Sequence, residues 1–355
     1  MNLDRTEALI RDALTEEAGR AVDPGAVRAR LHEGSRPARR YRAPIMAAAA
    51  VVVVAAAGIV VPQLLDRHGA APAAPAALAA KDLNVLVMGL DSGPGSPRAD
   101  SIVLAHLGQD GTGSAVSIPR DSWVDVPGHG KQRLNGTYTQ VRDDELAKGK
   151  SPADADEAAA RAMSTTVQTL TGVTVDHYAT IDMAGFAEIS TAAGGVPVCL
   201  KHAIDDPLTG VSFPAGQQTV SGDKALQFVR QRHGLPKGDL DRIVRLQAFL
   251  RSLANKVLTA PEATREHALT TLLTTVRDKV HTDPGWNLLD LTGQLLKLRG
   301  DTLRLGTVPV SDTPPPAAAG PALGVDPAKV RSFVQDQFAP GAAPAPGSGD
   351  APCVN

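Results

Sequence analysis

The stretch NVLVMGLDSGPGSPRADSIVLAHLGQDGTGSAVSIP, residues 84–119, decides the fold. It contains three short apolar runs, 84–90, 101–107 and 115–119, which are separated by segments rich in glycine, aspartate and serine. Short apolar runs bounded by turn residues are typical of buried β-strands. Because both connections are short and hairpin-like, we expect the three strands to form an antiparallel meander.

Such a meander brings charged residues to one edge of the sheet. Asp91 ends the first strand, Arg98 and Asp100 lie in the connection after it, and Arg120 and Asp121 follow the third strand. The end of one strand, the next connection and the end of the third strand share an edge in a meander. We therefore expect three carboxylates and two guanidiniums to gather there.

Helix and strand signals alternate along the rest of the chain. Ser151 followed by Pro152 is typical of a helix start, and Gly172 of its end. Residues 239–258 place apolar side chains at helical spacing, namely Ile243, Leu246, Leu250, Leu253 and Val257. Further helices are expected at 183–193, 224–232, 262–280, 286–298 and 326–338, and further strands at 175–182, 196–200 and 303–310. This pattern predicts an α/β domain of the α–β–α layered type around a central mixed or antiparallel sheet.

The composition limits the classes of partner. The chain has 355 residues and a formal net charge of -2. A near-neutral chain has no general attraction to nucleic acid, so any anion site must come from a local cluster of cations. We expect no nucleic-acid partner.

An uncharged apolar segment, residues 43–65, precedes the domain. It can span a hydrocarbon core of about 30 Å. Arginines gather on its N-terminal side, at Arg36, Arg39, Arg40 and Arg42. This asymmetry predicts a single-pass protein of the cell membrane, with a cytoplasmic N-terminus and an extracytoplasmic domain. The long charged leader favours an uncleaved signal anchor, and the alternative is cleavage within AAPAALAA, residues 73–80.

These segments divide the chain into a cytoplasmic part (1–42), a transmembrane anchor (43–65), a Pro/Ala linker (66–81), the extracytoplasmic domain (82–337) and a flexible tail (338–355). The two cysteines are Cys199 and Cys353. An extracytoplasmic location permits a disulfide between them. Cys199 also ends an apolar run, so a buried free thiol is the alternative.

A second charged cluster lies in FVRQRHGLPKGDLDRIVRLQ, residues 228–247. It contains Arg230, Arg232, Asp239 and Arg242 at the end of one expected helix and the start of the next. A helix N-terminus attracts anions, and guanidinium groups bind phosphate in a bidentate manner. Mg²⁺ usually takes one or two carboxylates together with phosphate oxygens. The mixture indicates a phosphate-ester or Mg²⁺–pyrophosphate ligand. Taken singly, however, each motif is more typical of a solvated helix face or of a turn with an ion pair.

Four segments carry a resemblance to a known family: NVLVMGLDS…RADSIVLAHL, SIPRDSWVDVPGHGKQRLNGTY, VDHYATIDMAGFAEISTAAGGVPVCL and ALQFVRQRHGLPKGDLDRIVRLQAFL. In order and register, across residues 82–255, the sequence resembles the LytR-CpsA-Psr family. The resemblance implies a membrane-anchored phosphotransferase. Such an enzyme moves a glycopolymer, of teichoic acid, capsule or arabinogalactan type, from a polyprenyl-pyrophosphate carrier to peptidoglycan. It also implies an α–β–α domain with a hydrophobic pocket for the polyprenyl chain.

The resemblance implies a role for each matching residue. Asp91 and Asp100 match the family's metal-binding aspartates, which hold Mg²⁺ or Mn²⁺. The pyrophosphate-binding positions are Arg120, Arg133, Arg230, Arg232 and Arg242. The candidate catalytic residues are Arg98, Arg120, Asp121 and Asp239, of which Asp121 and Asp239 are the candidate general bases. His177 lies in an apolar strand and is interpreted as structural.

Two departures from the family pattern bear on efficiency or donor preference. Gly93 stands shortly after Asp91, where members often have arginine, and the connection to Asp100 looks short. Arg245-Leu246-Gln247 replaces R-Q-Q, so one glutamine contact to the pyrophosphate is expected to be missing. Two alternative functions remain open: a polyprenyl-pyrophosphate pyrophosphatase, and a non-catalytic lipid-binding regulator of the envelope.

Overall fold

The computed structural model describes residues 81–91, 97–207, 209–261, 272, 274, 277, 279–286, 295, 297–298, 303–340 and 353–355. The expected membrane anchor and cytoplasmic segment lie outside these residues, as do most of the expected helices 262–280 and 286–298. Among the described residues, no helix has the length and apolarity needed to cross a membrane.

A mixed sheet of six strands, in the order β11-β6-β1-β2-β3-β12, forms the centre of the domain. Its middle is the antiparallel meander that the sequence predicts, since β1 pairs with β2 and β2 with β3. β6 runs parallel to β1, β12 runs parallel to β3, and β11 pairs antiparallel with β6. The strands are β1 (Leu83–Asp91), β2 (Arg98–Leu107), β3 (Gly113–Ser117), β6 (His177–Ile181), β11 (Val280–Thr282) and β12 (Arg304–Thr307).

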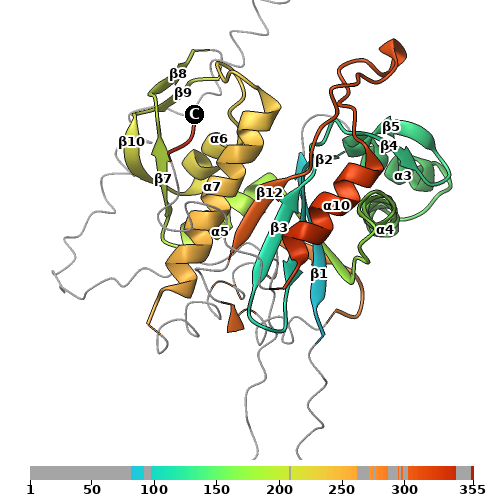
Figure 1. Cartoon of the computed structure of the whole chain (residues 1–355), viewed down its shortest axis with the longest axis horizontal. Coiled ribbons are helices and arrows are strands. Elements are labelled where there is room, and N and C mark those ends of the chain that lie inside the picture. Colours follow the sequence, from blue (N-terminus) through green and yellow to red (C-terminus); the bar gives the residue numbers. More distant parts are fainter. Residues whose placement is uncertain are drawn as a thin grey trace, which may run out of the picture. The chain divides into compact units, whose positions relative to one another are not determined.

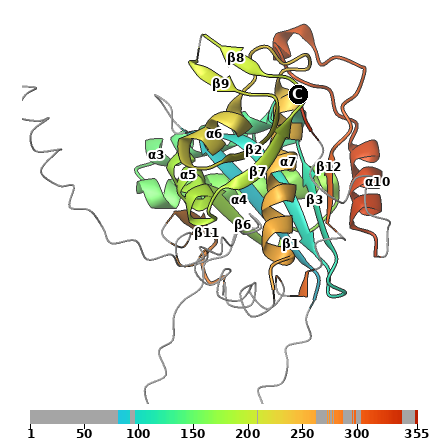
Figure 2. The same cartoon turned by 90° about the vertical axis from the view of Figure 1, so that its left-hand side faces the viewer.

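Both faces of the sheet are buried, because side chains alternate between two apolar clusters. Val85 and Val87 of β1 pack into one cluster, and Leu86 and Met88 pack into the other. The first cluster is covered by α5 (Met183–Ala192), α6 (Gly222–Arg230) and α7 (Asp239–Leu258), and the second by α3 (Leu134–Ala147), α4 (Pro152–Thr171) and α10 (Pro327–Phe338). Figure 1 shows the two helix groups on opposite sides of the sheet, and Figure 2 looks onto the side of α5, α6 and α7. The predicted α–β–α layers are confirmed.

Helix boundaries follow the local signals of the sequence. The Ser151 hydroxyl caps α4 by accepting a hydrogen bond from the Asp154 N–H. Gly172 ends α4 with a φ of 73°, a conformation that glycine adopts without a steric penalty. The predicted stripe on α7 is confirmed as well, since four of its five residues are buried and Leu250 packs against the same cluster.

Elements outside the sheet differ more from the sequence expectations. The hairpin of β4 (Trp123–Val126) and β5 (Gly130–Arg133) and the helix α3 follow the third strand directly, and the sequence analysis did not anticipate them. Two small antiparallel strand pairs lie on the side of α6 and α7 that faces away from the central sheet (Figure 1). They are β7 (Val196–Leu200) with β10 (Gly216–Val220), and β8 (Ile204–Asp206) with β9 (Val211–Phe213). A short 3-10 helix, Ala317–Ala319, interrupts the segment between β12 and α10.

The two cysteines form a disulfide bond. Val354 also pairs with Leu200 of β7, and the Arg245 side chain donates a hydrogen bond to the Asn355 carbonyl. The bridge between Cys199 and Cys353 is therefore confirmed over the buried free thiol. Of the segment predicted as a flexible tail, residues 353–355 are instead attached to β7 and α7, because the disulfide and these hydrogen bonds hold them there.

Candidate functional site

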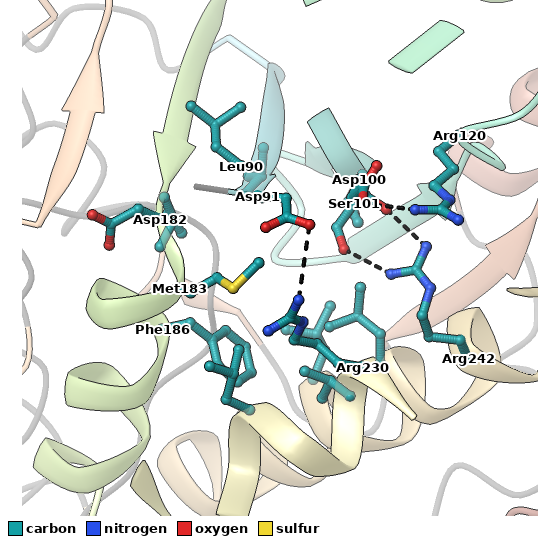
Figure 3. A pocket seen from close by; sticks show the side chains of 18 of the residues that line it. Leu90, Asp91, Asp100, Ser101, Arg120, Asp182, Met183, Phe186, Arg230 and Arg242 are labelled. Carbon is teal, nitrogen blue, oxygen red and sulfur yellow. Dashed lines mark hydrogen bonds and ion pairs between the residues drawn. The ribbon is translucent and has the colours of Figure 1, made fainter. Parts of the chain in front are cut away.

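A pocket opens at the edge of the sheet where β1 ends and β2 begins (Figure 3). Its interior is apolar, lined by Leu90, Met183, Phe186, Leu226, Val229, Leu246 and Leu250. Its mouth is charged, lined by Asp91, Asp100, Arg120, Arg230, Arg232 and Arg242, and a further carboxylate, Asp182, lines the pocket on the side of α5. This combination suits a ligand that has an apolar body and an anionic head.

The strands place the two aspartates at this mouth. Asp91 is the last residue of β1, and Asp100 lies near the start of β2, which pairs antiparallel with β1. Arg120 follows the end of β3, which lies beside the start of β2. The edge arrangement predicted from the meander is therefore present in the structure.

Asp100 and Arg120 form a tight pair. The Arg120 Nη1 donates to the Asp100 Oδ2 over 2.6 Å, and the Asn135 amide donates to the other carboxylate oxygen over 3.3 Å. Asn135 is buried, and its own backbone N–H donates to the Arg120 carbonyl. Asn135 thus ties the start of α3 to both members of the pair.

Arg242 is the most firmly held cation of the mouth. Its Nε donates to the Asp239 Oδ1 over 2.8 Å, and its Nη2 donates to the backbone carbonyl of Asp100 over 2.7 Å. Its Nη1 donates to the Ser101 hydroxyl over 3.2 Å. Arg242 is buried, because it sits on the first turn of α7 directly against β2.

Asp239 is surrounded by arginines. Its Oδ1 lies 3.3 Å from the Arg120 Nε and 4.0 Å from the Arg232 Nη1, in addition to its contacts with Arg242. Gly238, with a φ of 53°, allows the chain to turn into α7 at this residue. Asp239 therefore holds the arginines of three segments together.

Arg230 and Arg232 are held more loosely at the end of α6. Both side chains are about half exposed, at 51% and 45%. The Arg230 Nη2 lies 3.8 Å from the Asp91 Oδ2, and Figure 3 shows the two groups facing each other across the mouth. Burial, and then the nearby charge of Arg120, lower the pKa of Arg232 from its usual value. Lower hydration and a like charge both favour the arrival of an anion beside Arg232.

A family model described as the LytR_cpsA_psr family matches residues 66–317. The chain belongs to the LytR-CpsA-Psr family.

Curated relatives agree with this membership. The chain is 37% identical over 263 residues to the cell wall biosynthesis protein LcpA of Corynebacterium glutamicum, which covers 71% of this chain and 51% of LcpA. It is 29% identical over 232 residues to the polyisoprenyl-teichoic acid–peptidoglycan teichoic acid transferase TagU of Enterococcus faecalis, which covers 62% of this chain and 69% of TagU. The chain thus spans about half the length of LcpA.

The fold is similar to that of solved structures. The crystal structure of TagV from Bacillus subtilis superposes with a TM-score of 0.57 at 22% identity, covering 73% of this chain and 97% of TagV. At this level of identity the similarity concerns the fold alone.

Within this LytR-CpsA-Psr domain, the candidate site residues fall into three groups. Asp91, Asp100, Arg120, Arg230, Arg232 and Arg242 line the pocket. Asp239 lies behind the arginines, where it contacts three of them. Arg98, Asp121 and Arg133 are not among the lining residues.

Arg98, Asp121 and Arg133 have different surroundings. Arg98 is exposed and stands opposite Asp91 in the β1–β2 ladder. Asp121 accepts a hydrogen bond from the Arg133 Nη1 over 3.2 Å and lies 3.6 Å from the Arg120 Nε. The Arg133–Asp121 pair therefore adjoins the pocket from the side of β4 and β5.

Part of the apolar wall has no local signal in the sequence. Met183 and Phe186 reach the pocket because α5 starts directly after β6, where Asp182 caps it by accepting from the Gly185 N–H. Only the parallel pairing of β6 with β1 brings this helix start to the site, and no local pattern announces such a pairing. Leu246 and Leu250 of the apolar stripe on α7 line the pocket, whereas Phe249 is fully buried in the core.

The family departure at residues 245–247 also has a structural counterpart. The Gln247 amide donates to Ser117, Gly306 and Thr307, so this side chain bonds β3 and β12 rather than facing the pocket. Leu246, which precedes it, adds to the apolar wall. His177, at the opposite end of β6, pairs with Asp283 over 2.8 Å and stacks on Trp286.

The donor set at the mouth suits a magnesium or manganese ion only when a phosphate takes part. Among the described residues, no group of three or more His, Cys, Asp or Glu could hold a metal. Asp91 and Asp100 supply two carboxylates at the mouth. Asp100 accepts from Arg120 and Asn135, and a carboxylate has about four acceptor positions, so it keeps capacity for a cation. Mg²⁺ typically combines such a pair with phosphate oxygens and waters.

Proposed function

We propose that the chain is a membrane-anchored phosphotransferase that moves a glycopolymer from a polyprenyl-pyrophosphate carrier to peptidoglycan. The observation that carries this proposal is a pocket whose lining combines an apolar wall with four arginines and three aspartates, Asp91, Asp100 and Asp182. A polyprenyl chain fits the apolar wall, and a pyrophosphate fits the arginine cluster. The transferase activity named for the relative TagU supports the same reaction.

In the proposed reaction, a peptidoglycan hydroxyl attacks the phosphorus on the sugar side of the pyrophosphate. The new oxygen–phosphorus bond forms while the bond to the bridging oxygen breaks, and polyprenyl phosphate leaves along the apolar wall. Arg120 and Arg242 hold the phosphate oxygens from fixed positions, and Arg230 and Arg232 close on them from α6. Preorganised cations of this kind stabilise the charge of a phosphoryl-transfer transition state.

We assign the role of general base to Asp121. Among the described residues, Asp239 contacts three arginines and lies behind them, whereas Asp121 pairs with Arg133 and lies 3.6 Å from Arg120. Asp121 is also not among the residues that line the pocket, and it lies beside Arg120 on the side of β4 and β5. The hydroxyl proton would pass to Asp121 as the new bond forms.

Mg²⁺ or Mn²⁺ completes the proposal as cofactor. Asp91 and Asp100 would hold the ion together with the phosphate oxygens, and the ion would neutralise charge on those oxygens. The proposed location is the cell membrane, with residues 43–65 as anchor and the domain outside. A reporter fused after residue 80 that stayed in the cytoplasm would contradict this location.

A transfer assay with the full-length chain in detergent tests the function. The chain is mixed with a polyprenyl-pyrophosphate-linked glycan, Mg²⁺ and peptidoglycan, and glycan bound to the wall polymer is measured. We expect Arg120→Ala to lower the rate by at least about 100-fold. Lys148→Ala serves as the control, because Lys148 is exposed and pairs only with Glu145 among the described residues.

Two results would contradict the transferase. Release of phosphate products without wall-linked glycan would indicate a pyrophosphatase. Lipid binding without any turnover would indicate a regulator.

A further inference from the structure

One face of the β4–β5 hairpin points away from the core. Val124 and Val126 of β4 are buried in the cluster beneath α3 and α4. Because side chains alternate along a strand, Trp123 and Asp125 point to the opposite face. The antiparallel pairs Trp123–Arg133 and Asp125–Lys131 place both cations on that same face.

This outer face combines an aromatic ring with charged groups. Trp123 is partly exposed, and Asp125, Lys131 and Arg133 are exposed. No aromatic ring or cation stacks on Trp123 in the described part of the chain, and Asp125 and Lys131 have no ion pair there. The chain has only two tryptophans, and one of them, Trp123, faces outward here.

The outer face is continuous with the mouth of the pocket. Arg133 donates to Asp121, and Asp121 lies 3.6 Å from Arg120, which lines the pocket. The backbone between them is held firmly: the Leu323 N–H donates to the Asp121 carbonyl, and the Trp123 N–H donates to the Leu323 carbonyl. A ligand lying on Trp123 would therefore end close to the arginine cluster. Figure 1 shows the hairpin beside α3, at the margin of the domain.

We propose that this face, made of Asp121, Trp123, Asp125, Lys131 and Arg133, binds the peptidoglycan acceptor strand. The inference rests on the proposed transferase function and adds the site of its second substrate. The apolar side of an amino-sugar ring packs on an indole, and the free carboxylates of the peptide stem match Lys131 and Arg133. In an in-line transfer the nucleophile arrives opposite the leaving group. Since the polyprenyl phosphate leaves into the pocket, the acceptor must come from outside it, where Asp121 can take its proton.

The glycan of the donor is the competing occupant. It also projects from the mouth, but it needs no carboxylate next to the phosphorus. An acceptor hydroxyl needs a carboxylate that can take its proton. Asp121 is the carboxylate that lies between this face and the arginines of the pocket.

The two tryptophans allow a direct test with the full-length chain in detergent. Trp286→Phe leaves Trp123 as the only tryptophan, and Trp123→Phe leaves only Trp286, which stacks on His177 at the other end of β6. The probe is a soluble peptidoglycan fragment of two disaccharide units with their peptide stems. We expect it to change the emission of the Trp286→Phe protein and to leave that of the Trp123→Phe protein unchanged. Loss of the ring in Trp123→Ala should raise the acceptor KM about tenfold without changing the donor KM.

Lys131→Ala and Lys148→Ala form a matched pair, since both lysines are exposed. We expect only Lys131→Ala to weaken binding of the fragment, by about threefold. An emission change that persists in Trp123→Phe would overturn the proposal, as would a response to soluble donor glycan instead of the fragment. Binding of the fragment requires no turnover. If the protein transfers glycan but its Trp123 emission does not respond to the fragment, only the proposed acceptor face is contradicted. An intact response without transfer contradicts the proposed function alone.

Discussion

The two halves of the arginine cluster are held in different ways. Arg120 and Arg242 are largely buried and make short contacts with Asp100 and Asp239, at 2.6 and 2.8 Å. Arg230 and Arg232 are about half exposed, and their ion pairs are 3.8 and 4.0 Å long. The first half is thus formed before a ligand arrives, whereas the second can close on it. Preorganised cations cost no reorganisation during the reaction, and loosely held ones admit and release the substrate.

The largest effect on transfer is expected from Arg242. Arg242→Ala removes its hydrogen bonds to Asp239, Ser101 and Asp100 and leaves Asp239 with fewer partners in a partly buried place. We expect transfer to fall at least about 100-fold and the free energy of unfolding to fall by about 2 kcal/mol. Denaturant unfolding and the transfer assay measure the two effects. Arg242→Lys keeps the charge but loses the planar guanidinium with its several fixed donors. Full activity in this variant would therefore refute the idea that a preformed set of guanidinium hydrogen bonds is needed.

Removal of the disulfide tests whether the positions of Arg120 and Arg242 depend on the contacts of the C-terminal residues with α7. The disulfide closes a loop of 154 residues in sequence separation and attaches Asn355 to the fully buried Arg245, whose pKa burial lowers to about 10. We expect Cys199→Ala with Cys353→Ala to lower the free energy of unfolding by about 3–5 kcal/mol. The donor KM at low temperature should stay within about threefold, because Asp100 and Asp239 fix Arg242 locally. A large rise in the donor KM would mean that the disulfide-linked C-terminal residues 353–355, and not these aspartates, position Arg242.

The smallest effect on stability is expected from the half-exposed arginines, Arg230 and Arg232. Arg230→Ala should change the free energy of unfolding by less than about 0.5 kcal/mol, because exposed ion pairs contribute little. It should raise the donor KM about tenfold through the loss of one phosphate contact. Thermal unfolding and steady-state kinetics distinguish the two quantities. If Arg230→Ala destabilised the fold as strongly as Arg242→Ala, the contrast between the halves would be wrong.

Local signals in the sequence carry much of the fold. The meander of residues 84–119, the caps of α4 and the apolar stripe of α7 depend on neighbours a few residues apart, and the structure has all three as predicted. The meander also places Asp91, Asp100 and Arg120 at one edge, because strand order and direction suffice for that conclusion. The four motifs similarly carry the family membership, which the match to residues 66–317 shows.

The sequence by itself determined the layers, the charged edge and the family, since these depend on periodicity and residue type. Only the tertiary structure decided which charges meet. The pairing of β6 with β1 brings Met183 and Phe186 to the pocket, and Arg242 of α7 meets Asp100 across a separation of 142 residues. The same packing separates Arg133 from the pocket and joins it to Trp123 on a hairpin face. Ion pairs act over a few ångströms, so their partners are set by how all the layers pack together and not by any local pattern.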